Sequence, residues 1–433
     1  MLNVLKHECV RNLFLGVTTQ LVLLSATPAF AQDLVEFVNG SKVSGKVTAI
    51  RSARKEIEFE TKIGTRALTR TYAFSKIHAV TVDGKKSILT PKGATSGSAA
   101  TGVSRTESEV RSLIAAAGET PPDWFEKTKL NYPRTLDLDW PLKPPTKGWH
   151  SQKNMGQYIW SVINENPSRW HSGIKLVHHC ISLHQDNPTL LERDMKALGN
   201  MYFNLLQDYA RAAFWLEKAN PSVGRRDGIQ LAECYFRLGN KKMAMDMVVG
   251  KTLSMNAIKL YGAMGETNRA VRLAELFKNY SSNYQAFLLA GDALRQAGDL
   301  DEAVEYYQRV VDCDNFRNKD YEKRLKGRAQ DSIAAIRLYD KADVTKVADG
   351  SYSGNSIGYN GRLDVEVQVA AGKVRQVRVT AHREKQYYAA LTDTPDQILE
   401  RQSVQGIDAT SGATITSQAI VNATARALAK GAK

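Results

Sequence analysis

Cysteine is scarce in this sequence, with 4 in a chain of 433 residues. Cys180, Cys234 and Cys313 lie far apart, and the chain contains no C-x-x-C or C-x-x-C-H pair. Zinc ribbons, iron–sulfur centres and attached c-type haem therefore have no support in the sequence. We expect these three side chains to pack between helices as small apolar groups.

Motifs that bind metals are also missing. His171, His178, His179 and His184 lie near one another in the sequence, but no H-E-x-x-H or similar carboxylate pattern accompanies them. We interpret them as histidines of helix surfaces and of the core. The sequence therefore predicts no metal site, and it shows no catalytic constellation of side chains.

Long apolar runs are lacking beyond the first segment, so no later stretch is long enough to span a bilayer. In that segment Lys6 and Arg11 precede a mostly apolar run over 13–24, and an A-x-A sequence follows at 29–31. This pattern predicts a signal peptide over 1–31 and an exported protein, periplasmic or otherwise extracytoplasmic. An uncleaved membrane anchor is the alternative, so membrane association stays open.

Acidic residues are fewer than basic ones, 45 against 59, which gives a formal net charge of +14. A basic surface favours anionic lipid, acidic partners or nucleic acid, or it is only solvated. Export argues against nucleic acid, and no Lys/Arg block with interleaved aromatic residues favours it. We therefore predict no nucleic-acid partner.

The first segment after the leader, residues 32–91, has the pattern of a small all-β domain. Short strands are expected over 34–38, 42–50, 57–61 and 77–82, with a hairpin at Asn39-Gly40. We predict an SH3-like barrel. It carries no chemical motif, so a docking module or a spacer is its expected role.

Residues 92–152 are predicted to be a linker that is Gly/Ser-rich first and Pro/Trp-rich afterwards. A short helix is expected over 107–117. Trp124, Trp140 and Trp149 stand among prolines, which favours an extended segment held on a neighbouring domain by its rings. A carbohydrate-binding role for these tryptophans is the alternative.

Residues 153–340 are helical and repetitive. Alanines recur in a similar frame at intervals of 32, 26 and 33 residues, at Ala212, Ala244, Ala270 and Ala303. A glycine stands five residues before each of the last three. This pattern resembles the tetratricopeptide repeat (TPR), with small residues where paired helices touch and glycine at the turn between them. The first copy has one extra residue and the third is short.

The TPR resemblance implies a curved solenoid with a concave face. It is either a scaffold that binds protein partners or a rigid spacer, and the sequence favours neither.

The C-terminal segment combines strands with helices. Strict alternation over 363–369 predicts a half-buried strand, a turn follows at 371–373, and a second strand is expected over 374–379. A helix is predicted over 387–401. The alanine-rich run after residue 417 predicts a final helix.

Between these last two helices lies D-A-T-S-G-A-T-I-T-S, over 408–417. Hydroxyl residues at the start of a helix are common as caps, because their oxygens accept from free backbone N–H groups. The order of residues favours a more specific interpretation. Gly412 and Ala413 leave the Thr414 hydroxyl unshielded, so a phosphate there would meet free N–H groups and the positive end of the helix dipole.

This motif resembles D-x-x-S-G-A-T of the FMN-binding domain family, which includes the C subunit of Na⁺-translocating NADH:quinone reductase and the G subunit of the Rnf complex. The resemblance covers 347–430 and includes the opening D-G-x-Y-x-G from Asp349 to Gly354. It implies an α+β FMN-binding domain over 347–433. In the family, a flavin transferase that needs FAD and Mg²⁺ transfers FMN to the threonine that ends the motif, which here is Thr414.

The resemblance and the residue pattern together predict one set of cofactor-binding residues, with Thr414 as the covalent acceptor of FMN. The full set is Thr414, Asp408, Ser411, Gly412, Ala413, Thr416, Ser417, Gly354 and Tyr359. His382 and Glu384 follow the second strand and either face the flavin ring or lie on the surface.

Three functions are compatible with a multidomain chain of barrel, solenoid and FMN-binding domain. The first is an exported electron-transfer protein that takes electrons from a membrane donor and passes them to an unknown acceptor, with the repeats docking its partners. The second is an extracytoplasmic flavin-dependent reductase. The third is a TPR scaffold protein with a structural flavin domain. A flavin carries electrons by itself, so the protein need only position it.

Overall fold

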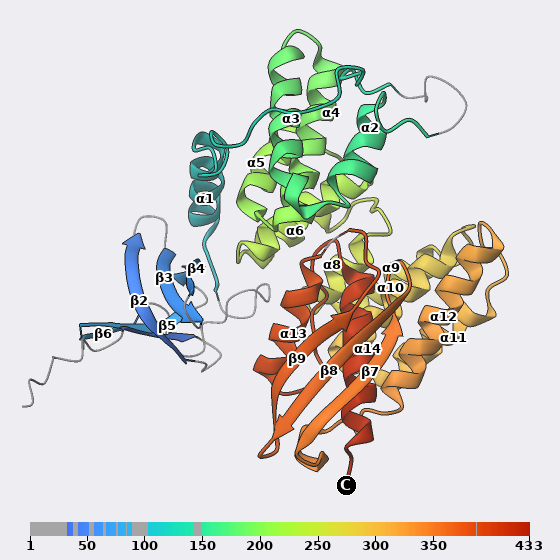
Figure 1. The fold of residues 1–433 in the computed structure, drawn as a ribbon. Coiled ribbons are helices and arrows are strands. Elements are labelled where there is room, and N and C mark those ends of the chain that lie inside the picture. The colour runs from blue at the N-terminus through green and yellow to red at the C-terminus, as the bar shows by residue number, and fades with distance from the viewer. Residues whose placement is uncertain are drawn as a thin grey trace, which may run out of the picture. The chain divides into compact units, whose positions relative to one another are not determined.

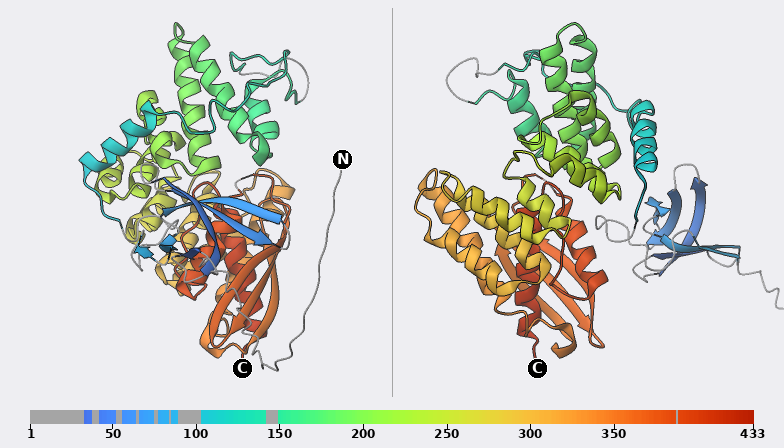
Figure 2. Two further views of the ribbon diagram at one scale, coloured as in Figure 1. Left: turned by 60° about the vertical axis from the view of Figure 1, so that its left-hand side comes forward. Right: turned by 180° about the vertical axis from the view of Figure 1, so that it is seen from behind.

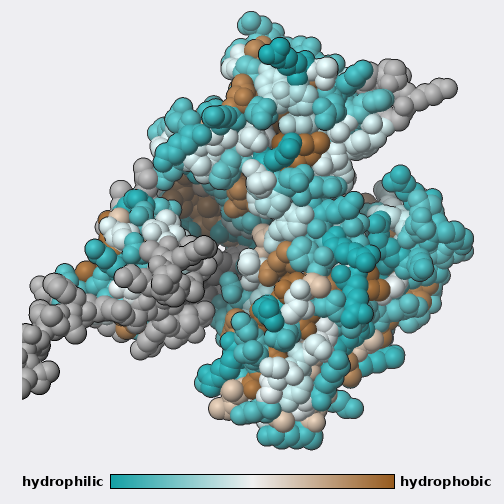
Figure 3. All heavy atoms as spheres, viewed as in Figure 1, coloured by the Kyte–Doolittle hydropathy of each residue, from teal (hydrophilic) through white to brown (hydrophobic). Residues whose placement is uncertain are grey.

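The computed structural model describes residues 33–37, 42–51, 56–63, 66–74, 77–83, 85–88, 103–141, 149–386 and 388–433. The chain divides into two compact units, Met1–Leu89 and Thr90–Lys433 (Figure 1). In the view of Figure 3, hydrophilic residues cover most of the surface and hydrophobic ones form small groups between them. No helix in the described part of the chain is both long and apolar enough to cross a membrane.

The first unit contains an antiparallel sheet with strand order β4-β3-β2-β1-β5-β6. Its strands are β1 (Asp33–Phe37), β2 (Lys42–Arg51), β3 (Glu56–Ile63), β4 (Arg66–Ala73), β5 (Ile77–Val82) and β6 (Lys85–Ile88). Alternate residues of the strands meet in a small core of Val35, Ile57, Phe59, Ile77 and Val80.

The sequence predicted β1, β2, β3 and β5 but missed β4 and β6. The predicted SH3-like barrel is not confirmed, because β4 and β6 are the two edges of the sheet in its described residues and do not pair. The predicted Asn39-Gly40 hairpin and signal peptide lie outside the described residues.

The segment before the repeats packs on the helical region, as its tryptophans predicted. It begins with α1 (Glu107–Glu119), whose start is fixed by a capping box between Thr106 and Glu109. Trp124 stacks on His171 with ring centroids 4.0 Å apart. The Trp140 indole donates to Asp194 over 2.6 Å. Trp149 differs, because 58% of it is exposed.

The helical region runs from α2 to α12 in antiparallel pairs. Its α-helices are α2 (Met155–Tyr158), α3 (Trp170–Leu183), α4 (Pro188–Met201), α5 (Tyr209–Ala219), α6 (Arg226–Arg237), α7 (Lys241–Val248), α8 (Ala257–Ala263), α9 (Thr267–Leu276), α10 (Asn283–Ala297), α11 (Leu300–Asp312) and α12 (Lys319–Ile336). A 3₁₀ turn at Pro167–Arg169 and π-helical turns at Ile159–Ile163 and Tyr202–Leu206 interrupt them.

The repeat pattern read from the sequence is confirmed in the packing. The four recurring alanines, Ala212, Ala244, Ala270 and Ala303, are completely buried. The recurring glycines take a left-handed backbone after α6, α8 and α10, with φ of 97° at Gly239, 74° at Gly265 and 93° at Gly298. Small residues thus let paired helices touch, and glycine ends the first helix of each pair without strain.

The extra residue of the first repeat has a structural counterpart. The turn Tyr202–Leu206 has π-helical hydrogen bonding, which absorbs an added residue without breaking the helix. Cys180 and Cys234 are buried between helices as predicted, while Cys313 is half-buried. His178 and His184 also lie inside, next to Tyr202 and Asp194 respectively.

The C-terminal region is an antiparallel sheet, β7 (Gly350–Ile357), β8 (Arg362–Ala370) and β9 (Lys373–Ala381), after a short 3₁₀ turn at Val344–Lys346. The sheet is followed by α13 (Ala390–Arg401) and α14 (Thr414–Lys430). The predicted helix over 387–401 therefore begins at Ala390. Alternate residues of β8 are buried, beginning with Leu363, so one face of the sheet packs against α14.

The repeats and the C-terminal region pack together as parts of one compact unit. The view from behind in Figure 2 shows α8 to α12, in yellow and light orange, beside α14 in dark red. Arg295 on α10 donates to Gln418 on α14 over 2.7 Å in a buried contact. The solenoid therefore uses part of its own surface to hold the C-terminal domain.

Candidate functional site

The loop 408–413 joins α13 to α14 and presents Thr414. Gly412 has φ of 77°, a left-handed conformation that favours glycine. A Cβ at this position would come within 2.5 Å of the Asn204 side-chain oxygen, so only glycine lets the loop approach the π-helical turn. Ala413 occupies the cap position of α14, and no side chain caps the first turn. The helix therefore begins with backbone N–H groups that no capping side chain satisfies.

Thr414 faces a cleft of about 330 Å³ between the loop and the helical repeats. One wall comes from the C-terminal region: Tyr359, Gly412, Ala413, Thr414, Ile415 and Thr416. The opposite wall comes from the helical region: Trp160, Phe203, Arg226, Ile229, Gln230, Glu233, Asn256, Lys259 and Leu289. Cavities from about 300 to 1,000 Å³ are typical of small-molecule sites.

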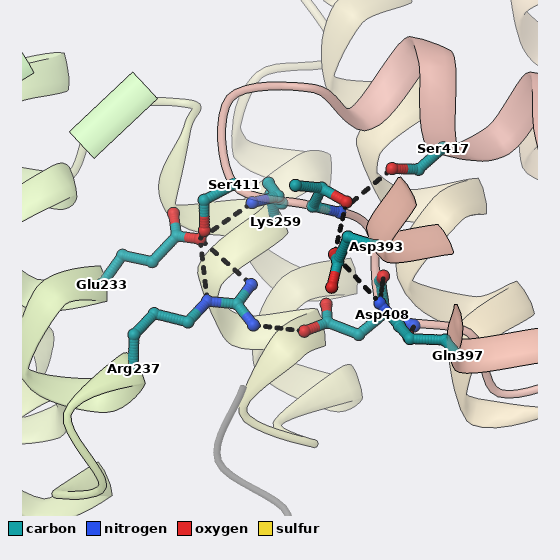
Figure 4. A network of polar contacts seen from close by, with 9 residues as sticks. Glu233, Arg237, Lys259, Asp393, Gln397, Asp408, Ser411 and Ser417 are labelled. Atoms are coloured by element: carbon teal, nitrogen blue, oxygen red, sulfur yellow. Dashed lines mark hydrogen bonds and ion pairs between the residues drawn. The ribbon is translucent and has the colours of Figure 1, made fainter. Parts of the chain in front are cut away.

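A network of buried charges joins the two walls (Figure 4). One oxygen of Glu233 on α6 accepts from the Ser411 hydroxyl over 2.6 Å and from the Lys259 ammonium over 2.9 Å. Arg237, one turn further along α6, bonds both Glu233 and Asp408. Burial opposes ionisation of Glu233, but Lys259 and Arg237 outweigh it and hold the pKa of this carboxyl at about 2.

A second set of hydrogen bonds shapes the loop from within. Gln397 on α13 bonds both the backbone N–H and the carbonyl of Asp408. The Thr410 backbone N–H donates to the Ser417 hydroxyl over 3.0 Å, and its own hydroxyl donates to Asp393 over 2.6 Å. Burial raises the pKa of Asp393. These contacts fix the loop, so the position of Thr414 is set by α13 as well as by α14.

Glu384 supports the cleft from the side of the sheet. It is 5% exposed, so a surface role for this residue is excluded. Its carboxylate accepts from the Tyr359 backbone N–H over 2.8 Å and from the Thr416 hydroxyl over 2.9 Å. Burial raises the pKa of this carboxyl, although both hydrogen bonds oppose the shift. His382, in contrast, is exposed.

The structure brings most of the predicted site residues together. Tyr359, Gly412, Ala413, Thr414 and Thr416 line the cleft. The predicted residues Asp408, Ser411 and Ser417 lie just behind it and hold the loop through the contacts described above.

Gly354 has a different position from the one the sequence suggested. It lies in β7, where a Cβ would come within 2.0 Å of the Ala423 carbonyl oxygen of α14. This glycine permits strand and helix to pack closely, and it is not among the residues that line the cleft.

The sequence analysis did not identify the opposite wall. Glu233, Arg237 and Lys259 lie in ordinary repeat positions, and their distance along the chain from Asp408 hides the contact. The one usable signal was the extra residue of the first repeat, because the π-helical turn that absorbs it brings Asn204 against Gly412. Such turns are frequent at functional sites.

Comparison with known proteins agrees with this geometry. The model of the FMN-binding domain family matches residues 358–429, and that of a tetratricopeptide repeat matches residues 284–315. An uncharacterized protein of Treponema pallidum (strain Nichols) is 32% identical over 90 residues. The match covers 20% of this chain and 25% of that protein, so the chain spans about a quarter of its relative. No solved structure matches.

The chain thus contains an FMN-binding domain and a tetratricopeptide repeat, which define a flavin-binding protein with repeat-mediated interactions. The site fits such a cofactor. The uncapped first turn of α14 suits a phosphate, and the cleft beside it has the size and partly apolar lining that suit a flavin ring.

Proposed function

We propose that this protein is an exported electron-transfer protein that carries FMN bound covalently to Thr414. The observation that carries the proposal is the position of Thr414. Its half-buried side chain lies at the first position of α14, beside an uncapped helix start and inside a cleft large enough for a ligand. The family match to residues 358–429 covers this residue and identifies FMN as the ligand.

The bond would be a phosphodiester. The Thr414 oxygen attacks the phosphorus on the flavin side of FAD, a new P–O bond forms, and the P–O bond to the AMP leaving group breaks. The hydroxyl proton leaves to a base of the transferase. In this reaction the chain supplies only the acceptor hydroxyl. A separate flavin transferase, with FAD and Mg²⁺, is therefore required.

The residues around Thr414 would hold the cofactor. Backbone N–H groups of 414–416, which form the positive end of the helix dipole, would hold the phosphate. Tyr359 and Thr416 border the cleft and are fixed by Glu384. FMN supplies one- or two-electron transfer, while these groups orient it and limit its contact with solvent.

Export rests on the sequence pattern of residues 1–31. Outside the cytoplasm a dissociated cofactor is lost, so a covalent bond has a clear advantage there. A membrane electron donor and a separate acceptor are the expected partners, and the surface of the repeats that is not used by the C-terminal domain is available to dock them.

Intact-mass measurement of the mature protein, produced together with a flavin transferase, tests the proposal. We expect a mass increase of FMN less one water, and in-gel flavin fluorescence that survives denaturation. Thr414→Val should abolish both while the protein stays folded. Thr392→Val is the matched control, because Thr392 is exposed on α13 and far from the motif in sequence, and it should load fully.

Two results would reject parts of the proposal. Thr414→Val protein that still carries the added mass would show that another residue is the acceptor. A wild-type protein without added mass, next to an active transferase, would show that the flavin is not covalent.

A further inference from the structure

The helical wall of the cleft has the composition of a binding surface, although it belongs to the repeats and lies outside the matched FMN-binding domain. Phe203, Ile229 and Leu289 give it apolar side chains, and Trp160 lines the same cleft. Trp160 is 42% exposed, a large value for a tryptophan, and it lines the cleft, so part of this side chain is open to a ligand there.

The same wall also has unused polar groups. Gln230 is 5% exposed, and its side-chain carbonyl oxygen has no hydrogen-bond partner among the described residues. A buried acceptor without a partner costs about 1–3 kcal/mol, so a ligand that donates to it would recover that cost. Its amide nitrogen already lies 3.5 Å from Asn204, which leaves the oxygen for the cleft.

Charge on this wall is positive. Glu233 is balanced by Lys259 and Arg237, and Asp408 by Arg237. Arg226 adds an exposed guanidinium at the start of α6 with no ion pair in the described part of the chain. The wall therefore presents cationic donors next to an apolar surface, which suits a planar ring with carbonyl oxygens at its edge.

We propose that the repeat helices form the second wall of the flavin site, with Trp160 against the isoalloxazine ring and Gln230, Arg226 and Lys259 toward its polar edge. This inference rests on the proposed function. A ring tethered at Thr414 lies within the same cleft, and the wall on the side of the FMN-binding domain consists mainly of small and hydroxyl side chains. The ring edge donates through one N–H, which matches Gln230, and accepts through carbonyls, which match the cations.

The flavin's own fluorescence tests the stacking. An indole against an isoalloxazine ring quenches its emission, so Trp160→Ala should raise the quantum yield of loaded protein several-fold, and Trp160→Phe should give a smaller rise. Trp149→Ala is the matched control, because Trp149 is 58% exposed and does not line the cleft. Equal yields in Trp160→Ala and Trp149→Ala would overturn the inference.

The midpoint potential tests the charged edge. Reduction adds negative charge to the flavin, which a nearby cation stabilises, so Arg226→Ala should shift the potential to a more negative value. Arg225→Ala removes a neighbouring exposed charge that does not line the cleft, and it should shift the potential less. Equal shifts would show that Arg226 does not face the ring.

Loading is measured by intact mass before either experiment, so failure of the covalent bond is recognised separately. If wild type carries no covalent flavin, the same variants are titrated with free FMN. Trp160→Ala and Arg226→Ala should then weaken binding relative to their controls. Unchanged affinities would reject the helical wall independently of Thr414.

Discussion

Arg237 on α6 and Asp408 in the loop 408–413 form an ion pair that joins the repeats to the FMN-binding domain, although 171 residues separate them. The two side chains are only 3% and 10% exposed. Arg237 also bonds Glu233, whose carboxylate holds Ser411. The position of the S-G-A-T motif thus depends on charges that the repeats supply.

Removing one charge of this pair should destabilise the protein. Asp408→Asn preserves shape but leaves the Arg237 guanidinium short of a partner, and we expect a loss of about 3 kcal/mol in the free energy of unfolding. Denaturant unfolding measures it. Asp364→Asn is the control, because Asp364 pairs with an arginine that is 68% exposed and should cost at most about 1 kcal/mol. Equal losses would show that the buried pair has no special weight.

Acid should weaken the same junction. The pKa of Glu233 is about 2 in the folded protein against 4.5 for an ordinary glutamate side chain, so the unfolded chain binds its proton first as pH falls. The stabilisation is complete above the unfolded value and is lost as pH falls from there through the folded one, about 3 kcal/mol in total. When the free energy of unfolding is plotted against pH, the wild-type curve should be steeper than that of Glu233→Gln within this window. Below the folded pKa the two curves should have the same slope.

The comparison with Glu233→Gln isolates this residue. Burial raises the pKa of Glu384 and of Asp393, so these two carboxyls act in the opposite direction, but both remain in the variant. A wild-type slope no steeper than that of Glu233→Gln between the two pKa values would contradict the assignment.

Gly412→Ala should lower the free energy of unfolding by crowding the contact between the loop and the repeats. Alanine at a left-handed backbone costs about 1–2 kcal/mol, and here its Cβ would also press on Asn204. Gly372→Ala has the same backbone penalty, with φ of 65°, but its Cβ would meet nothing within 4 Å. We expect Gly412→Ala to lose about 1 kcal/mol more than Gly372→Ala in unfolding experiments, because of the added crowding. Identical losses would mean that Asn204 moves away without cost.

Local patterns predicted much of this protein. Alternation identified β8, the recurring Ala212 and Gly239 identified the helix pairs, and the S-G-A-T order identified the residues around Thr414. These features depend on neighbours in sequence, which is why a single chain reveals them. The boundary of α13 was three residues in error, since nothing in the local pattern excludes a helical start before Ala390.

The cleft could not be predicted in the same way. Its second wall depends on contacts such as Glu233 with Ser411, 178 residues apart, and a glutamate within a repeat looks like any solvated helix residue. Gly354 shows the opposite error, because it was assigned to the site although it does not line the cleft. A glycine near a motif suggested contact with a cofactor, whereas the close approach of α14 to β7 explains it.

A further junction between the two parts of the unit lies at Asp331 on α12. Its carboxylate accepts from Ser356 on β7 and Asn422 on α14, and pairs with Arg426 over 2.5 Å. Asp331→Ala leaves the buried Ser356 hydroxyl without this acceptor and removes one partner each from Asn422 and Arg426, which keep bonds to Ser332 and Asn355. We therefore expect a loss of about 2–4 kcal/mol. Asp340→Ala, an exposed aspartate shortly after the same helix, should change stability by less than about 0.5 kcal/mol.

Hydrogen exchange distinguishes a local effect from a general one. If Asp331 joins α14 and β7 to the repeats, then Asp331→Ala should lower amide protection mainly in those two elements, while α4 and α5 keep theirs. Protection lost equally along the whole unit would show that the repeats and the C-terminal domain unfold as one cooperative body. In that case the contacts at Asp331 and at Arg237 stabilise a single core. The two walls of the cleft at Thr414 would then separate only with global unfolding.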